Sequence, residues 1–68
     1  MARRLSSSAF ISILTSNGFT FISKRGSHAK YRDDNSHTVI VPLPRKDIPI
    51  GTLRSMIRQS CLPKELFD

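Results

Sequence analysis

The chain has 68 residues, of which 11 are Lys or Arg and 5 are Asp or Glu, so its formal net charge is +6 at pH 7. This length allows one small domain, residues 1–68, and excludes a two-domain enzyme or a deep cofactor cleft. With 38% hydrophobic and 24% charged residues, the composition predicts a globular chain rather than a disordered one. The single cysteine, Cys61, permits no internal disulfide and has no companion at a zinc-ligand spacing, which favours a reducing, cytoplasmic location.

Charge is unevenly distributed along the chain. The basic start, Met1 to Leu5, is followed by a stretch that serines interrupt, so we expect neither a secretion signal nor a membrane span. No carboxylate precedes Asp33, whereas six basic residues do: Arg3, Arg4, Lys24, Arg25, Lys30 and Arg32. This distribution favours a polyanionic partner, although basic side chains also serve simply to keep a small domain soluble.

The first predicted element is a helix between residues 6 and 18. Phe10, Ile13 and Leu14 follow the i, i+3, i+4 spacing of one apolar helix face. Ser7 is the expected N-cap, because its hydroxyl can accept a hydrogen bond from a first-turn amide, and Asn17-Gly18 supplies a left-handed stop.

Two strands are predicted next. Residues 19–25 change to a period of two, with Phe19 and Phe21 on one face and Thr20 and Lys24 on the other. After a tight turn at Gly26, residues 27–32 alternate again. One face of this second strand carries Ala29 and Tyr31, and the other carries His28, Lys30 and Arg32.

The remaining elements follow a polar turn at residues 33–36, whose adjacent aspartates we expect to support turn geometry. Residues 38–41 form the run of highest β propensity, and prolines then end the sheet. A second helix is expected to begin between residues 49 and 52 and to bury Leu53, Met56 and Ile57, with Arg54 and Arg58 on a solvated side. Residues 63–67 are expected to add one turn that docks Leu66 or Phe67.

This order of elements predicts an α+β domain, α-β-β-β-α, with both helices on one face of a three-stranded antiparallel sheet. Phe19, Phe21, Ala29 and Tyr31 are then candidates for the covered face. His28, Lys30 and Arg32 are candidates for the open face, which is left to solvent or a ligand.

His28 is the best candidate for chemistry, because the sequence contains no Gly-rich phosphate loop, no carboxylate pair and no metal-ligand cluster. Imidazole can transfer a proton near neutral pH while the cations of the same face hold a phosphate, which suits phosphodiester cleavage without metal or cofactor. One histidine cannot be acid and base in the same step, and water, Tyr31 or Lys24 could serve as the second group. On residue types alone, a lone histidine such as His28 is more often an exposed strand residue without a role. This interpretation is stronger still for His37, which lies beside the turn.

The motifs together resemble the HicA toxin family of type II toxin–antitoxin systems. The resemblance runs from Asn17-Gly18-Phe19 to Leu62, and its pieces are Gly26-Ser27-His28, Tyr31-Arg32, Val39-Ile40-Val41-Pro42, Ile50-Gly51-Thr52-Leu53-Arg54-Ser55, Ile57 and Arg58-Gln59. Members commonly have glycine where this chain has Cys61, which we expect to be a small apolar filler at the end of the second helix.

The resemblance implies an mRNA interferase with a fold similar to double-stranded RNA-binding domains. It further implies metal-independent cleavage in which His28 is catalytic, no required homo-oligomer, and a HicB antitoxin that covers the active face and often carries a DNA-binding module. The residues expected to bind RNA are Lys24, Arg25, Ser27, Lys30 and Arg32. A non-catalytic RNA-binding module of the same fold and a domain that binds an acidic protein are the alternatives.

Overall fold

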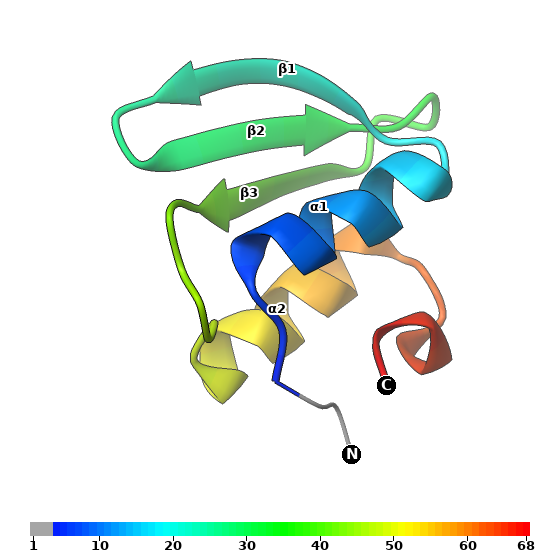
Figure 1. Cartoon of the computed structure of the whole chain (residues 1–68). Helices are drawn as coiled ribbons and strands as arrows, with labels where there is room; N and C mark the ends of the chain where they lie inside the picture. The colour runs from blue at the N-terminus through cyan, green and yellow to red at the C-terminus, as the bar shows by residue number, and fades with distance from the viewer. Residues whose placement is uncertain (1–3) are drawn as a thin grey trace.

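A computed structural model describes residues 4–68 (Figure 1). Arg3, which belongs to the basic start of the sequence, lies outside the described residues. The elements follow the predicted order: α1 (Ser7–Ser16), β1 (Thr20–Arg25), β2 (His28–Arg32), β3 (Thr38–Pro42), α2 (Ile50–Ser60) and a 3-10 turn, η1 (Lys64–Phe67). No helix among the described residues is long and apolar enough to cross a bilayer.

The three strands form one antiparallel sheet in the order β1-β2-β3, and both helices pack on the same face of it (Figure 1). The strands alternate as expected, because Ala29, Tyr31, Val39 and Val41 are buried between the sheet and the helices. Leu14, Leu53 and Met56 complete the core from the helical side. The predicted α+β fold with one open sheet face is therefore confirmed.

Helix α1 begins one residue earlier than its expected cap implies. Ser6, not Ser7, is the N-cap, and its Oγ accepts a hydrogen bond from the Ala9 amide at 3.1 Å. Ser7 is the first helical residue, and its buried hydroxyl instead donates to the carbonyl oxygen of Pro42 at 2.5 Å. The prediction of Ser7 as the cap was wrong because three successive serines offer equivalent hydroxyls, and only tertiary packing distinguishes them.

The C-terminal elements close the core. Leu53, Met56 and Ile57 of α2 are buried as predicted, and η1 docks Phe67, whose ring stacks on Phe10 with centroids 4.9 Å apart. Cys61 is exposed and ends α2 with a left-handed backbone, φ +58°. The expectation that Cys61 is a small apolar filler at the end of this helix was therefore wrong, because its side chain is exposed.

Strand β1 contains a β-bulge, which changes the faces of its second half. Thr20 and Phe21 pair with Arg32 and Tyr31, but Ser23 pairs with Lys30, so Ile22 is the extra residue. Side chains after the bulge are therefore shifted by one position relative to strict alternation. Lys24 lies opposite Ala29, on the helix-side face, and the prediction that it shares a face with Thr20 was wrong.

Phe21 also departs from prediction, because it is 52% exposed rather than buried. It shares the face of Tyr31 and meets that ring edge-on, with centroids 5.7 Å apart. However, α1 and α2 pack mainly against β3, so β1 extends past the helical layer (Figure 1). The prediction of the face on which Phe21 lies was correct, and the prediction that Phe21 is buried was wrong.

Candidate active site

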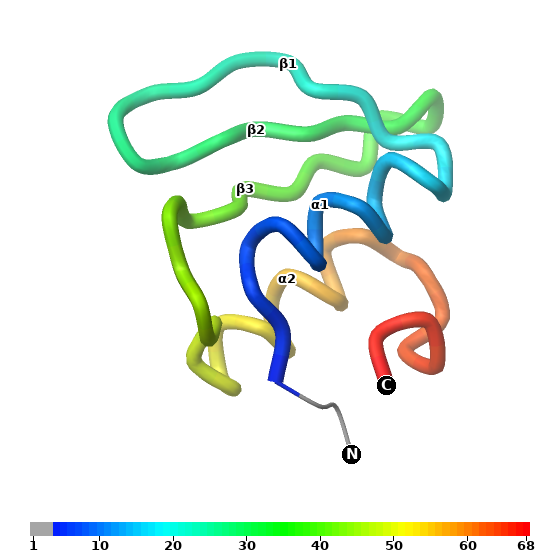
Figure 2. The backbone as a smooth tube through the Cα atoms, in the orientation of Figure 1, coloured from blue at the N-terminus to red at the C-terminus, as the bar shows by residue number. Residues whose placement is uncertain are grey.

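A tight turn places His28 at the outer end of the sheet. Gly26 and Ser27 join β1 to β2, and Arg25 pairs directly with His28 across this hairpin (left in Figure 2). Gly26 has φ +57°, the positive value that type II′ turns require at their first central position. No atom lies within 4 Å of a side chain added there, so the glycine is needed for its backbone conformation alone. The Ser27 carbonyl accepts from the Leu43 amide at 2.6 Å, which fastens the turn to the chain after β3.

The open face of the sheet gathers cations around His28. Arg25 lies opposite His28 in β1, and Lys30 follows two residues further along β2 on the same face. Together with Ser23 and Ile40 these side chains line a shallow hollow of about 270 Å³. None of the three strands contains a carboxylate. A phosphate in this hollow would therefore meet two cationic side chains and an imidazole, with no opposing charge from the strands.

His28 is exposed, and its ring has no hydrogen-bond partner within residues 4–68. An unpaired imidazole at the surface is free to exchange a proton with a bound ligand, provided that the ligand reaches it. The chemistry available here is proton transfer at a phosphate that neighbouring cations hold in place.

The other residues predicted to bind RNA are distributed around this hollow. Arg32 is exposed at the far end of β2, where its Nε donates to the Thr38 hydroxyl at 3.0 Å. Ser27 is exposed in the hairpin turn beside His28. Lys24 is exposed but belongs to the opposite face of the sheet, because the bulge shifts it there. The structure thus brings Arg25, Lys30 and His28 together and separates Lys24 from them.

Two residues that line the hollow, Ser23 and Ile40, were missed by the sequence analysis. Ile40 lies directly opposite Lys30, so aligning the second and third strands in antiparallel register was the signal that could have found it. Ser23 reaches this face only because of the bulge at Ile22, and nothing in the residue types marks a bulge there.

The second histidine has a structural partner. The Nδ1 atom of His37 lies 2.7 Å from the Asp33 carboxylate, whose other oxygen accepts from the backbone amides of Asn35 and His37. Burial alone raises the pKa of Asp33, but the hydrogen bonds from His37, its charge and the Asn35 amide outweigh this effect, so the pKa lies below the ordinary value of 3.8. This pair closes the β2–β3 turn, which agrees with the predicted structural role of Asp33.

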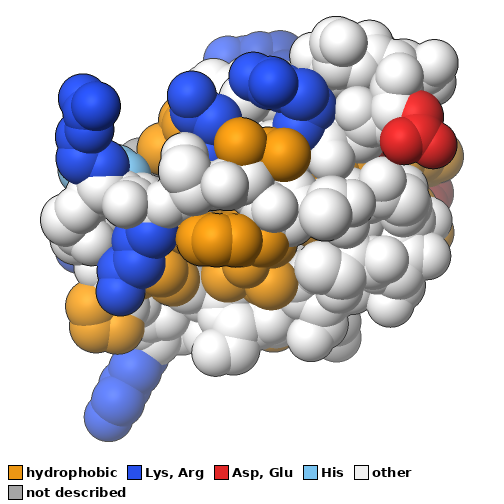
Figure 3. All heavy atoms as spheres, turned by 90° about the horizontal axis from the view of Figure 1, so that it is seen from above, with side chains coloured by type: hydrophobic (Ala, Val, Ile, Leu, Met, Phe, Trp, Pro, Cys, Tyr) orange, Lys and Arg blue, Asp and Glu red, His pale blue; other side chains and the backbone are white. Residues whose placement is uncertain are grey.

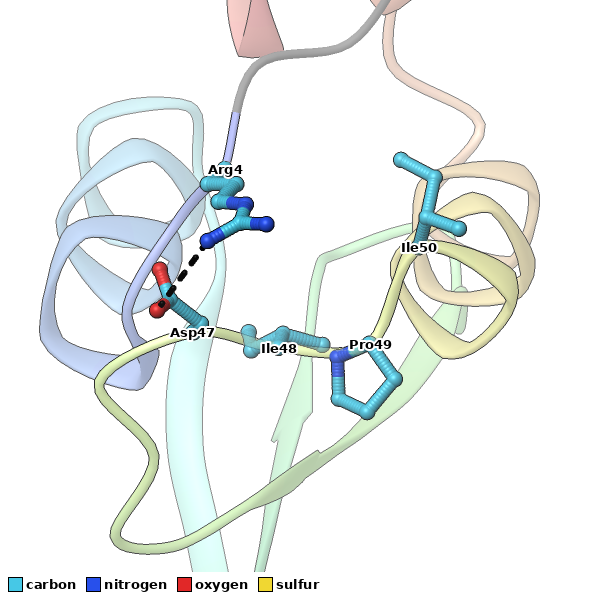
Figure 4. A pocket seen from close by; sticks show the side chains of 5 residues that line it. All are labelled: Arg4, Asp47, Ile48, Pro49 and Ile50. Carbon is cyan, nitrogen blue, oxygen red and sulfur yellow. Dashed lines mark ion pairs between the residues drawn. The ribbon is translucent and has the colours of Figure 1, made fainter.

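A second hollow lies at the start of α2, away from the predicted site residues (Figure 4). Its lining is Arg4, Asp47, Ile48, Pro49 and Ile50, with an exposed ion pair between Arg4 and Asp47 at 3.8 Å. Its two charged side chains pair with each other, and the rest of its lining is apolar. Across the part of the chain that the structure describes, no three His, Cys, Asp or Glu side chains converge as metal ligands would.

The fold and the site define a class of protein: a small basic α+β domain that presents one histidine among cations on an uncovered sheet. Residues 7–62 match the family described as HicA toxin of bacterial toxin–antitoxin systems, and the chain belongs to this family. No curated protein sequence matches the chain. Membership makes the protein the toxin member of a toxin–antitoxin pair, and the matched residues include the entire hollow around His28.

Proposed function

We propose that this toxin is a metal-independent endoribonuclease, an mRNA interferase whose catalytic residue is His28 and whose partner is a HicB-type antitoxin. The observation that carries the proposal is the exposed, unpaired imidazole of His28 between Arg25 and Lys30 on a sheet face without carboxylates. Arg25, Ser27, Lys30 and Arg32 bind the RNA backbone on this face. Lys24, on the other face, adds only long-range attraction.

The proposed step breaks one phosphodiester bond. The RNA 2′-oxygen forms a bond to the adjacent phosphorus and gives up its proton, while the bond to the 5′-oxygen breaks and that oxygen takes a proton. His28 transfers one of these two protons. Tyr31 is buried on the helix-side face and Lys24 projects from that face, so water, which reaches the exposed site, exchanges the other proton. Arg25 and Lys30 stabilise the charge that accumulates on the phosphorus oxygens.

The test compares the two histidines of the chain. His28→Ala should slow cleavage of a 5′-labelled single-stranded RNA by about 10²- to 10⁴-fold, the usual contribution of one acid–base group. His37→Ala is the matched control, because His37 belongs to the Asp33 turn and not to the hollow. Its cleavage rate should stay near that of the unaltered protein, and circular dichroism should show that both variants are folded.

Two substrate controls complete the experiment. An RNA with a 2′-deoxy sugar at the cut site should resist cleavage there, because the attacking oxygen is missing. EDTA should leave the rate unchanged. Unchanged cleavage by His28→Ala would refute the histidine mechanism, and a rate lost in EDTA and restored by a divalent cation would refute the metal-free step. Bound but intact RNA would identify the alternative, a non-catalytic RNA-binding module of this fold.

A further inference from the structure

The outer edge of β1 is a stretch of sheet backbone that has no strand beside it, and the side chains of β1 are exposed along its whole length. Strand β1 pairs only with β2, and all six of its residues, Thr20–Arg25, are exposed. The opposite edge strand, β3, packs against α1 and α2 (Figure 1). A free edge presents unpaired N–H and C=O groups to solvent and can accept a further strand.

The side chains along this edge divide into an apolar half and a cationic half. Phe21 and Ile22 are 52% and 46% exposed, although both are large hydrophobic residues. Lys24 and Arg25 follow at the end that leads to the hairpin turn. Figure 3, which views the molecule from the β1 side, shows exposed hydrophobic groups with Lys and Arg side chains beside them.

These features favour an acidic protein strand over the other possible occupants. RNA offers phosphate acceptors but cannot supply the alternating amide donors and carbonyl acceptors that a strand edge needs. A second copy of the chain brings another net charge of +6 and no carboxylate in its own β1 to offset Lys24 and Arg25. A strand with carboxylates at one end and apolar residues at the other satisfies both halves of the edge.

We propose that the antitoxin partner adds an extended, acidic strand to the β1 edge, antiparallel to β1, with carboxylates beside Lys24 and Arg25 and apolar side chains beside Phe21 and Ile22. This inference rests on the antitoxin partner and not on RNA cleavage. Arg25 shares the open face with His28. A carboxylate that pairs with Arg25 therefore occupies the approach to the hollow and competes with an RNA phosphate.

The experiment uses the full chain and its cognate antitoxin. In the complex, hydrogen exchange at those amides of residues 20–25 that point away from β2 should slow at least about tenfold relative to the free toxin, because these amides gain partners. Ile22→Glu should weaken the complex at least about tenfold, since it places a charge in the apolar half of the edge. Ile50→Glu is the matched control: Ile50 is 47% exposed at the start of α2, and its change should alter affinity by less than about twofold. Thermal unfolding checks that both variants are folded.

Each alternative has its own result. Unchanged exchange at residues 20–25, or equal loss of affinity in the two variants, would overturn the proposal. So would protection of the same amides in the free toxin at high concentration, which would identify a second copy, or equal protection by a short single-stranded RNA. A toxin that fails to cleave RNA can still show the expected protection in the complex, so failure of the proposed function is distinguishable from failure of this inference.

Discussion

Because of the bulge in β1, we predict that Arg25 and Lys24 contribute unequally to RNA cleavage. Arg25 lies directly opposite His28 on the open face, and Lys24 lies opposite Ala29 on the helix-side face. Strict alternation along the strand would have reversed these positions. Arg25→Ala should therefore impair RNA cleavage, and Lys24→Ala should have a much smaller effect.

The size of the difference follows from the cross-strand geometry. Opposed side chains on antiparallel strands have Cβ atoms about 5 Å apart, and we therefore take about 6 Å as the separation between a phosphate at His28 and the Arg25 guanidinium. At about 6 Å, two unit charges interact by about 0.7 kcal/mol in water and by about 2.8 kcal/mol at an effective dielectric constant near 20. Loss of Arg25 should thus lower kcat/KM by about 3-fold to about 100-fold. Lys24 is on the other face and exposed to screening by salt, so its loss should change kcat/KM by less than about twofold.

Single-turnover cleavage of a labelled RNA at about 0.15 M salt measures both variants. Because the two side chains are exposed, thermal unfolding should show little change in either protein. The difference between the variants should shrink as salt is raised, since screening weakens the Arg25 interaction. A Lys24→Ala variant as impaired as Arg25→Ala would refute the assignment of faces.

Two further predictions concern stability. Cys61→Gly should raise the free energy of unfolding by about 1 kcal/mol, because glycine relieves the cost of a left-handed residue at φ +58°, and Tm should rise by about 4–8 °C; Cys61→Ala keeps the strained conformation and should show no such gain. The lowered pKa of Asp33 means that its ionised form stabilises the fold above the ordinary value of 3.8 and that this contribution is lost as the pH falls through the lower folded-state pKa. In thermal unfolding, Asp33→Asn should therefore be less stable than the unaltered protein at pH 7 and equally stable at pH 2. A difference in stability that stays constant over this pH range would contradict a contribution from the ionised Asp33 carboxylate.

Much of the fold was predictable from local patterns. Helical spacing identifies the buried faces of both helices, including Phe10 and Leu14 in α1 and Leu53 in α2. The period of two in β2 assigns His28 to the open face of the sheet. Both are short-range regularities that follow from helix and strand geometry, so they need no knowledge of the neighbouring elements.

The features of the fold and the candidate site that were not predicted depend on tertiary contacts. The bulge at Ile22 determines that Arg25 and Ser23, rather than Lys24, face the hollow, and no residue type in β1 marks it. Phe21 has the sequence context of a core residue but lies beyond the reach of the helices. The choice between Ser6 and Ser7 as cap depended on the Pro42 carbonyl, 35 positions along the chain from Ser7.

Because the helices cover one face of the sheet and leave the other open, the side chains that stabilise the fold differ from those that can act on a ligand. Residues such as Val39 and Val41 hold the layers together from below, whereas His28 and Arg25 contribute nothing to that packing. Variants that escape toxicity in a growth selection should consequently separate into two populations. One population yields little folded protein, and the other accumulates normally as folded protein but is inactive.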